Sequence, residues 1–212
     1  MSFVDPKIHP ETQGLREFAT HNNPIEQFRA WFQEAQAGQI EQPEAMTLAT
    51  CTPEGIPSAR MVLLRGIDER GFVFYTNYTS RKARELTNNP YAALVFFWEP
   101  MDRQVRIEGT VERTSSKESD AYYEQRPRGS RIGAWASPQS QVILSREELE
   151  HKVAEVLKQY GDEGQVPRPP FWGGFRVVPK VIEFWQGRDN RLHDRLRFRL
   201  SDTDWELERL AP

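Results

Sequence analysis

Positive charge is concentrated in one short stretch of this chain, FWQGRDNRLHDR, which covers residues 184–195. The stretch places three arginines and His193 within eight residues, beside the aromatic rings of Phe184 and Trp185. Guanidinium groups bind phosphates and carboxylates, and an imidazole can donate or accept a hydrogen bond near neutral pH. The pattern therefore predicts a site for an anionic ligand. Because side chains alternate along a strand, the arginines after Leu192 also suit a solvated strand face.

A second cationic segment, TNYTSRK, covers residues 76–82 and runs from a predicted strand directly into a predicted helix. Free backbone N–H groups at a helix N-terminus attract phosphate, and Arg81 and Lys82 add two positive side chains. The segment predicts a phosphate site, although such a pair can also be a solvated part of a helix surface. Arg60 and Arg65 flank the apolar MVLL of the preceding hairpin, and strand alternation alone would expose one of them.

The other polar and aromatic candidates give weaker signals. The segment 129–140, GSRIGAWASPQS, contains glycine and serine and is predicted to be a polar loop. Trp135, Trp172 and Trp185 are predicted to lie in the core rather than at a ligand, because aromatic rings carry a large apolar area.

Composition limits the function classes. The 212 residues carry a net charge of −3, while residues 188–199 alone carry +3, so the positive charge is local. This distribution argues against a nucleic-acid-binding protein, which needs a broad basic surface. The single cysteine forms no internal disulfide, and the four histidines show no metal-ligand spacing. With no apolar run long enough to span a bilayer, the sequence predicts a cytoplasmic protein without a metal or membrane partner.

Strands and helices are segregated along the chain. Residues 1–22 are predicted to form a flexible N-terminal arm, and residues 23–212 a single domain. Strands are predicted over 45–51, 58–67, 71–77, 91–98, 103–113, 175–185, 192–200 and 205–210. The run 91–98 is apolar throughout and is predicted to be buried on both faces. Helices are predicted after Asn23 and Ser80, and after the capping-box serines Ser115 and Ser145. This order predicts an α+β fold with an antiparallel barrel.

Eleven short motifs together resemble the pyridoxine/pyridoxamine 5′-phosphate oxidase family. The similarity extends from about residue 24 to the C-terminal residue and keeps the family's order. The motifs are RMVLLR (60–65), FYTN (74–77), SRKA (80–83), RQVR (103–106), RP (126–127), IGAWAS (132–137), QS (139–140), FWGG (171–174), IEFWQG (182–187), RLHDR (191–195) and ERLAP (208–212).

The resemblance implies an FMN-binding split β-barrel with peripheral helices, and a homodimer with FMN at the interface. The positions that it implies for the cofactor are Arg60, Met61, Val62, Leu63, Leu64, Arg65, Tyr75, Thr76, Arg81, Lys82, Gln104, Gln139, Ser140, Trp185 and Arg195. Those implied for the substrate are Arg65, Tyr122, Arg126, Ser130, Arg191, Leu192 and His193, with Arg191 and His193 as the catalytic pair over the pyridine ring.

The implied reaction is oxidation of pyridoxine 5′-phosphate or pyridoxamine 5′-phosphate by oxygen to pyridoxal 5′-phosphate, with release of hydrogen peroxide and, from the amine, ammonia. The alternatives are a related split-barrel flavin oxidoreductase and a non-catalytic flavin or pyridoxal-phosphate carrier. Two departures from the family pattern stand out. Arg65 replaces the usual lysine, and Leu15 and Phe18 occupy positions of the family's lid segment where an arginine and a tyrosine are expected.

Overall fold

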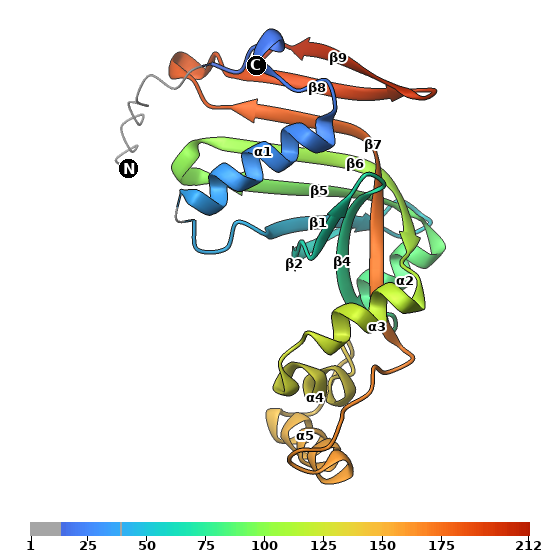
Figure 1. Ribbon diagram of the computed structural model, residues 1–212. Coiled ribbons are helices and arrows are strands. Elements are labelled where there is room, and N and C mark those ends of the chain that lie inside the picture. The colour runs from blue at the N-terminus through green and yellow to red at the C-terminus, as the bar shows by residue number, and fades with distance from the viewer. Residues whose placement is uncertain (1–13, 39) are drawn as a thin grey trace, which may run out of the picture.

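The computed structural model describes residues 14–38 and 40–212 of this protein (Figure 1). Short 3-10 turns lie at Glu17–Ala19, Glu99–Met101 and Asp189–Arg191. The α-helices of the described ranges are α1 (Pro24–Ala37), α2 (Arg81–Asn88), α3 (Ser116–Glu124), α4 (Arg128–Ala136) and α5 (Arg146–Tyr160). The strands are β1 (Ala45–Cys51), β2 (Pro57–Leu63), β3 (Gly66–Asp68), β4 (Gly71–Asn77), β5 (Tyr91–Trp98), β6 (Arg103–Arg113), β7 (Trp172–Gln186), β8 (Asp194–Ser201) and β9 (Asp204–Leu210).

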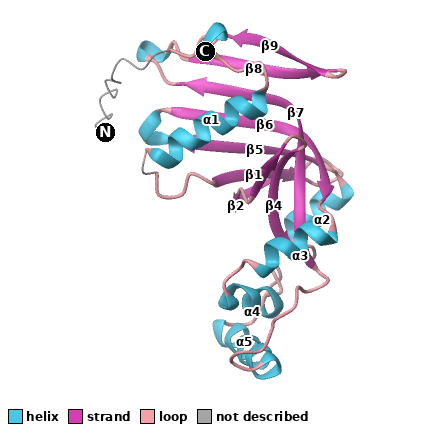
Figure 2. Ribbon diagram, in the orientation of Figure 1, coloured by secondary structure: helices cyan, strands magenta, loops and turns pink. Residues whose placement is uncertain are grey.

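The strands form one antiparallel sheet in the order β2-β1-β5-β6-β7-β4-β3, with β8 and β9 continuing from the far half of β7. The sheet curls, so that the end of β2 approaches β4, where the Arg65 amide donates a 2.8 Å hydrogen bond to the Val73 carbonyl. Figure 2 shows α1 lying across the sheet while α3, α4 and α5 extend from one end. The predicted α+β fold with an antiparallel split barrel and peripheral helices is confirmed.

Strand β7 belongs to both halves of the sheet because it changes partner along its length. Its first part pairs with β4 from Trp172 to Val177, and its last part pairs with β8 from Val181 onward. Pro179 lies at the change, between the residues that pair with β4 and those that pair with β8. Opposite it, Gly109 lies at a β-bulge, and a side chain there would meet the Val178 carbonyl oxygen at 2.1 Å. One strand therefore links the two ends of the molecule.

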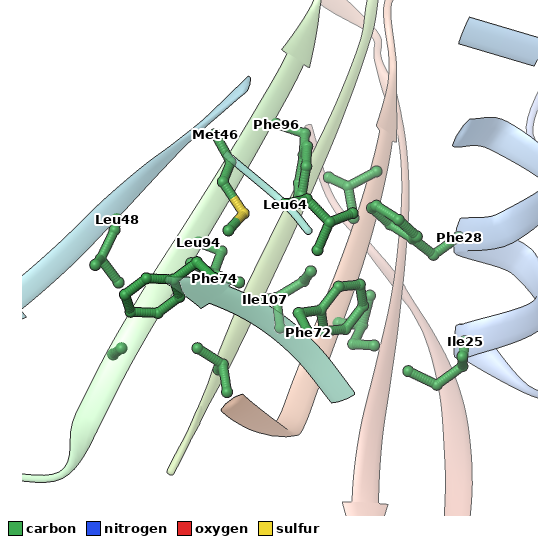
Figure 3. Packing of buried hydrophobic residues seen from close by; sticks show 14 of the residues in the cluster. Ile25, Phe28, Met46, Leu48, Leu64, Phe72, Phe74, Leu94, Phe96 and Ile107 are labelled. Carbon is green, nitrogen blue, oxygen red and sulfur yellow. The ribbon is translucent and has the colours of Figure 1, made fainter. Parts of the chain in front are cut away.

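The core lies between α1 and the concave face of the sheet (Figure 3). Phe28 of α1 is fully buried and packs edge-to-face against Phe72, with ring centres 4.9 Å apart, and against Phe96 at 5.0 Å. Asn23 begins this helix as predicted, since its side chain accepts a hydrogen bond from the Ile25 amide. Burial of this aromatic cluster stabilises the sheet that carries the polar residues predicted for the site.

Three local predictions are wrong. The single strand predicted over 58–67 is two strands, β2 and β3, because the Leu64 amide donates to Glu44 beside β1 whereas the Arg65 amide donates to Val73 of β4. The predicted loop over 129–140 begins as a helix, α4, because Ile132 and Ala136 recur at helical spacing and both are buried. The strand over 91–98 is buried on one face only, since Tyr91 is 62% exposed and Phe97 56% exposed. The predicted capping box forms at Ser115. At Ser145 only the side-chain cap forms, because Glu148 accepts from the Leu144 amide instead.

The described part of the predicted arm, residues 14–22, contacts the C-terminal strands. The Leu15 amide donates to Asp194 at 3.2 Å, and the Arg209 guanidinium donates to Glu17 at 2.6 Å. Residues 1–13 lie outside the described ranges, as does the side chain of Phe18. Within the described ranges, no helix is long and apolar enough to cross a bilayer, and no group of three His, Cys, Asp or Glu residues could hold a metal ion.

Candidate active site

A cavity of about 670 Å³ opens between β2, β4, α2, α3 and α4. Four of the residues that line it are basic, and none of the lining residues is acidic. We call it the cationic cavity, and its lining consists of Arg60, Met61, Val62, Leu63, Arg65, Tyr75, Thr76, Lys82, Tyr122, Gln125, Arg126, Pro127, Ser130, Gln139 and Trp172. Arg60 and Arg65 each have a carboxylate partner outside the lining, Glu85 at 3.3 Å and Glu44 at 3.8 Å. A lining with four cations and no carboxylate still attracts an anionic ligand.

Lys82 supplies a buried positive charge at one end of the cavity. Its Nζ donates to Thr76 Oγ1 at 3.2 Å and to Gln139 Oε1 at 3.3 Å, and it has no ion-pair partner among the described residues. Burial, and then the charge of Arg60, lower the pKa of Lys82 to about 8. A buried ammonium held only by neutral oxygens is a binding point for an anion.

Arg60 and Arg81 lie close to Lys82 and share one carboxylate. Arg60 Nη2 lies 3.3 Å from Glu85 Oε2, and Arg81 Nε donates to Glu85 Oε1 at 2.8 Å. Ser80 caps α2 by accepting a hydrogen bond from the Ala83 amide. The strand-to-helix junction therefore brings together the cationic residues that the sequence predicted for a phosphate.

Arg126 supplies a second cationic point in the same cavity. Its guanidinium carbon lies 4.6 Å from the centre of the Trp172 ring, and burial lowers its pKa. Nη1 is buried and has no hydrogen-bond partner in the described part of the chain. Such an unsatisfied donor is costly unless a ligand accepts from it, so Arg126 marks a second anion position.

Three nearly parallel aromatic rings form one wall beside Arg126. The rings of Tyr75 and Tyr122 have centres 4.0 Å apart and planes 11° apart, and Trp172 lies 5.4 Å from Tyr75 at 9°. Burial, and then the charge of Glu118, raise the pKa of Tyr75 to about 12, so its hydroxyl stays protonated. This stack provides a flat apolar surface beside the cationic groups.

A second group of predicted residues gathers elsewhere, at the ends of β6, β7 and β8. Gln104 pairs across the sheet with Trp185, and Trp185 pairs with Arg195. The Trp185 and His193 rings have centres 4.6 Å apart, and His193 Nδ1 accepts a 3.1 Å hydrogen bond from the Arg188 amide. We call this group the strand-end cluster, and its members are Gln104, Trp185, Arg191, Leu192, His193 and Arg195.

The turn between β7 and β8 presents two members of the strand-end cluster to solvent. Asn190 and Arg191 both adopt positive φ, at 56° and 60°, and Leu192 is 68% exposed. Arg195 is held in the sheet, where its Nε donates to Glu183 at 2.8 Å, a contact that raises its pKa. Arg191 and Leu192 are thus exposed on a strained turn, which is common for residues that meet a ligand.

Twelve of the residues predicted for cofactor or substrate line the cationic cavity. None of the residues of the strand-end cluster lines it. In the order of the sheet, β6, which carries Gln104, lies three strands away from β2, which carries Leu63. Leu64 belongs to the hydrophobic core, Arg81 lies beside the cavity, and Ser140 follows Gln139 on the exposed loop after α4. One protomer therefore carries the predicted site as two separate parts.

Sequence reasoning missed three lining residues, Gln125, Pro127 and Trp172, and also the buried Glu85. Trp172 was predicted to be a core residue, and it is 6% exposed, yet it also borders the cavity. The signal for Gln125 and Pro127 was their position beside Arg126. For Glu85, the signal was its i,i+4 spacing from Arg81.

Comparison with known families gives two matches that together cover most of the chain. Residues 32–160 match the pyridoxamine 5′-phosphate oxidase family, and residues 172–212 match the pyridoxine 5′-phosphate oxidase C-terminal dimerisation region. The first range contains every residue of the cationic cavity except Trp172. The second contains Trp185, Arg191, Leu192, His193 and Arg195 of the strand-end cluster.

Similar proteins agree with this assignment. The pyridoxine/pyridoxamine 5′-phosphate oxidase of Salinibacter ruber is 62% identical over 90% of this chain and 90% of its own length. That of Synechocystis is 53% identical over 100% of this chain and 99% of its own length.

Two solved structures share the fold. PhzG from Burkholderia lata, in complex with tetrahydrophenazine-1-carboxylic acid, has a TM-score of 0.89 at 33% identity and covers 96% of this chain and 100% of its own. An FMN-binding protein from Nostoc punctiforme related to pyridoxamine 5′-phosphate oxidase has a TM-score of 0.71 at 19% identity, covering 89% of this chain and 98% of its own. By its sequence matches and its fold, the chain belongs to the pyridoxamine 5′-phosphate oxidase family.

Proposed function

We propose that this protein oxidises pyridoxine 5′-phosphate and pyridoxamine 5′-phosphate to pyridoxal 5′-phosphate with FMN and oxygen, releasing hydrogen peroxide and, from the amine, ammonia. The observation that carries the proposal is the presence of two cationic points in one cavity, Lys82 with Arg60 and the unsatisfied Arg126. Two phosphorylated ligands that react with one another require two such points. A relative that is 62% identical over 90% of the chain bears the name of this enzyme.

The residues of the cavity fit FMN. Lys82 has no carboxylate partner among the described residues, and Arg60 and Arg81 lie beside it, so the three would hold the phosphate. Tyr75, Thr76 and Gln139 would contact the remainder of the cofactor. When bound, FMN supplies a two-electron acceptor for the substrate carbon that becomes the aldehyde.

The substrate phosphate would bind at Arg126, with Tyr122 and Ser130 lining the same part of the cavity. A phosphate there would accept from Arg126 Nη1, the buried donor that otherwise lacks a partner. The aromatic wall would support the pyridine ring and exclude water from the reacting carbon.

Arg191 and His193 would complete this site from a second protomer. Both belong to the strand-end cluster, within the range that matches the family's dimerisation region. Phe97, which is 56% exposed, pairs with Gln104 of that cluster and extends the surface with an apolar ring. We propose a homodimer in which the cavity of one protomer faces the strand-end cluster of its partner, with FMN between them.

The test uses the full-length protein reconstituted with FMN. Incubation with pyridoxine 5′-phosphate and oxygen should produce aldehyde and hydrogen peroxide in equal amounts, and pyridoxamine 5′-phosphate should release ammonia as well. A protein that binds no FMN, or that binds FMN and yields neither product, would rule out the proposed oxidase.

A further inference from the structure

Glu85 of α2 lies behind the cationic cavity and is not one of its lining residues. Its side chain is 6% exposed, yet it accepts hydrogen bonds from three elements of the fold. Oε2 accepts from Thr50 of β1 at 2.5 Å and from Ser58 of β2 at 2.7 Å, whereas Oε1 accepts from Arg81 of α2 at 2.8 Å. Burial alone would raise its pKa, but these hydrogen bonds lower it to about 2.

The same carboxylate also organises Arg60. Arg60 Nη2 lies 3.3 Å from Glu85 Oε2, and Arg60 Nη1 donates to Thr50 Oγ1 at 2.5 Å, the hydroxyl that donates in turn to Glu85. Nη1 also donates to the Leu48 carbonyl at 3.2 Å. These contacts fix the guanidinium relative to β1, so little side-chain freedom remains to be lost when an anion binds.

Arg81 depends on Glu85 more strongly than Arg60 does. Its side chain is 55% exposed, and among the described residues its one side-chain hydrogen bond runs from Nε to Glu85. Using Nε for this contact leaves the two terminal nitrogens for another acceptor. Without Glu85, this long side chain would regain its rotamer freedom and lose its fixed position.

Charge balance gives Glu85 a second effect. Burial lowers the pKa of Arg60, and the charge of Arg81 adds to this shift; burial also lowers the pKa of Lys82, and the charge of Arg60 adds to it. The three cations therefore include two repulsive pairs, Arg60 with Arg81 and Arg60 with Lys82. Within the described ranges, Glu85 is the carboxylate in contact with two of them. Its negative charge offsets this repulsion while the cavity contains no anion.

We infer that Glu85 is a positioning residue for the FMN phosphate, which holds Arg60 and Arg81 in their binding arrangement without touching the cofactor. The inference rests on the proposed function, because it assumes that FMN is the ligand of this cradle. The alternative is that Glu85 repels the phosphate, so that its removal would strengthen FMN binding; the inference excludes this alternative. Glu85 lies outside the cavity, and Arg60 and Arg81 already neutralise its charge. Its effect on the position of the two arginines therefore outweighs its repulsion of the phosphate.

The test compares FMN with riboflavin, which has the same ring but no phosphate. Dissociation constants for both are measured by flavin fluorescence with the apo form of the full chain, as wild type and as Glu85→Gln. The substitution should weaken FMN binding about tenfold and riboflavin binding less than about twofold. It removes the charge-assisted hydrogen bonds that hold Arg60 and Arg81, and these arginines would contact the phosphate, which riboflavin lacks. Glu150→Gln is the matched control, because Glu150 forms the same i,i+4 pair with Arg146 at 3.0 Å on exposed α5.

Three results would overturn the inference: unchanged FMN affinity, tighter FMN binding, or equal weakening of FMN and riboflavin, which would indicate a general defect of the fold. If Glu85→Gln does not fold, Ser58→Ala replaces it, with a smaller loss expected for FMN alone. In an Arg81→Ala background, Glu85→Gln should cost less than in the wild type, and full additivity would count against the inference. Wild-type protein that binds no FMN would instead refute the proposed function.

Discussion

The guanidinium carbon of Arg126 lies 4.6 Å from the centre of the Trp172 ring, so the cation rests on the face of the indole. Trp172 is in turn parallel to Tyr122 within 6°. The two residues come from distant parts of the sequence, and the first residue of β7 thereby positions the arginine that follows α3. Trp172 is therefore a support for the proposed substrate phosphate site.

Replacing Trp172 by leucine should raise the KM for pyridoxine 5′-phosphate about tenfold, because the cation–π contact and the stack are lost together. FMN affinity should change little, since Arg60 and Lys82 keep their contacts. Steady-state kinetics at saturating FMN measure the first effect, and a fluorescence titration measures the second. Trp205→Leu, on β9 and outside the cavity, is the control. An unchanged KM would contradict this role.

FMN affinity should depend on pH through Lys82. In the apo protein the pKa of Lys82 is about 8, lowered by burial and by Arg60, and a bound phosphate dianion would raise it. Affinity should therefore be constant between pH 7 and 8 and then fall by up to about tenfold per pH unit above 8, as binding requires proton uptake. Titrations from pH 7 to 9.5 measure this. Lys82→Arg should remove the dependence, because a guanidinium stays charged. A flat wild-type profile would show that Lys82 does not contact the phosphate.

Local sequence signals predicted the elements that carry the proposed phosphate site. The strand character of 71–77 and the cap at Ser80 give β4 and α2 nearly to the residue, and these two elements suffice to bring Thr76 and Lys82 together. The strands 45–51 and 103–113 also have the predicted bounds. These features depend on contacts between residues close in sequence, or on one periodic pattern.

Features that depend on distant contacts could not be predicted in the same way. Trp172 looks like any core tryptophan until β4 and α3 are packed against it, and Glu85 looks like half of a surface pair with Arg81 until β1 and β2 cover it. The separation of the cavity from the strand-end cluster follows from sheet order, which strand patterns do not specify. Whether β5 is exposed on one face depends on which strands and helices cover it.

Arg81 and Arg191 should separate cofactor binding from turnover. Arg81→Ala should weaken FMN binding about tenfold, with kcat recovered at saturating FMN, because in the proposed site the residue would contact only the phosphate. Arg191→Met should lower kcat/KM about a hundredfold while FMN affinity stays near the wild-type value, since in the proposed site the residue would contact the substrate. Matched losses of FMN affinity and turnover in both variants would refute this division.

The proposed dimer makes a prediction about mixed protomers. Arg126→Met removes a cavity residue, and Arg191→Met removes a residue of the strand-end cluster, so each variant alone should have little activity. If each site combines the cavity of one protomer with the cluster of its partner, a hybrid dimer contains one site with both changes and one site with neither.

Unfolding and refolding an equal mixture should therefore restore about a quarter of the wild-type activity, because half of the dimers are hybrids and each has one intact site. The control is each variant refolded alone, which should recover nothing. If the complete site lay within a single chain, every site in the mixture would carry one substitution and the mixture would remain as inactive as its components. Size-exclusion chromatography of the mixture separates this outcome from a failure to form dimers, because only a dimeric and inactive mixture contradicts the shared site.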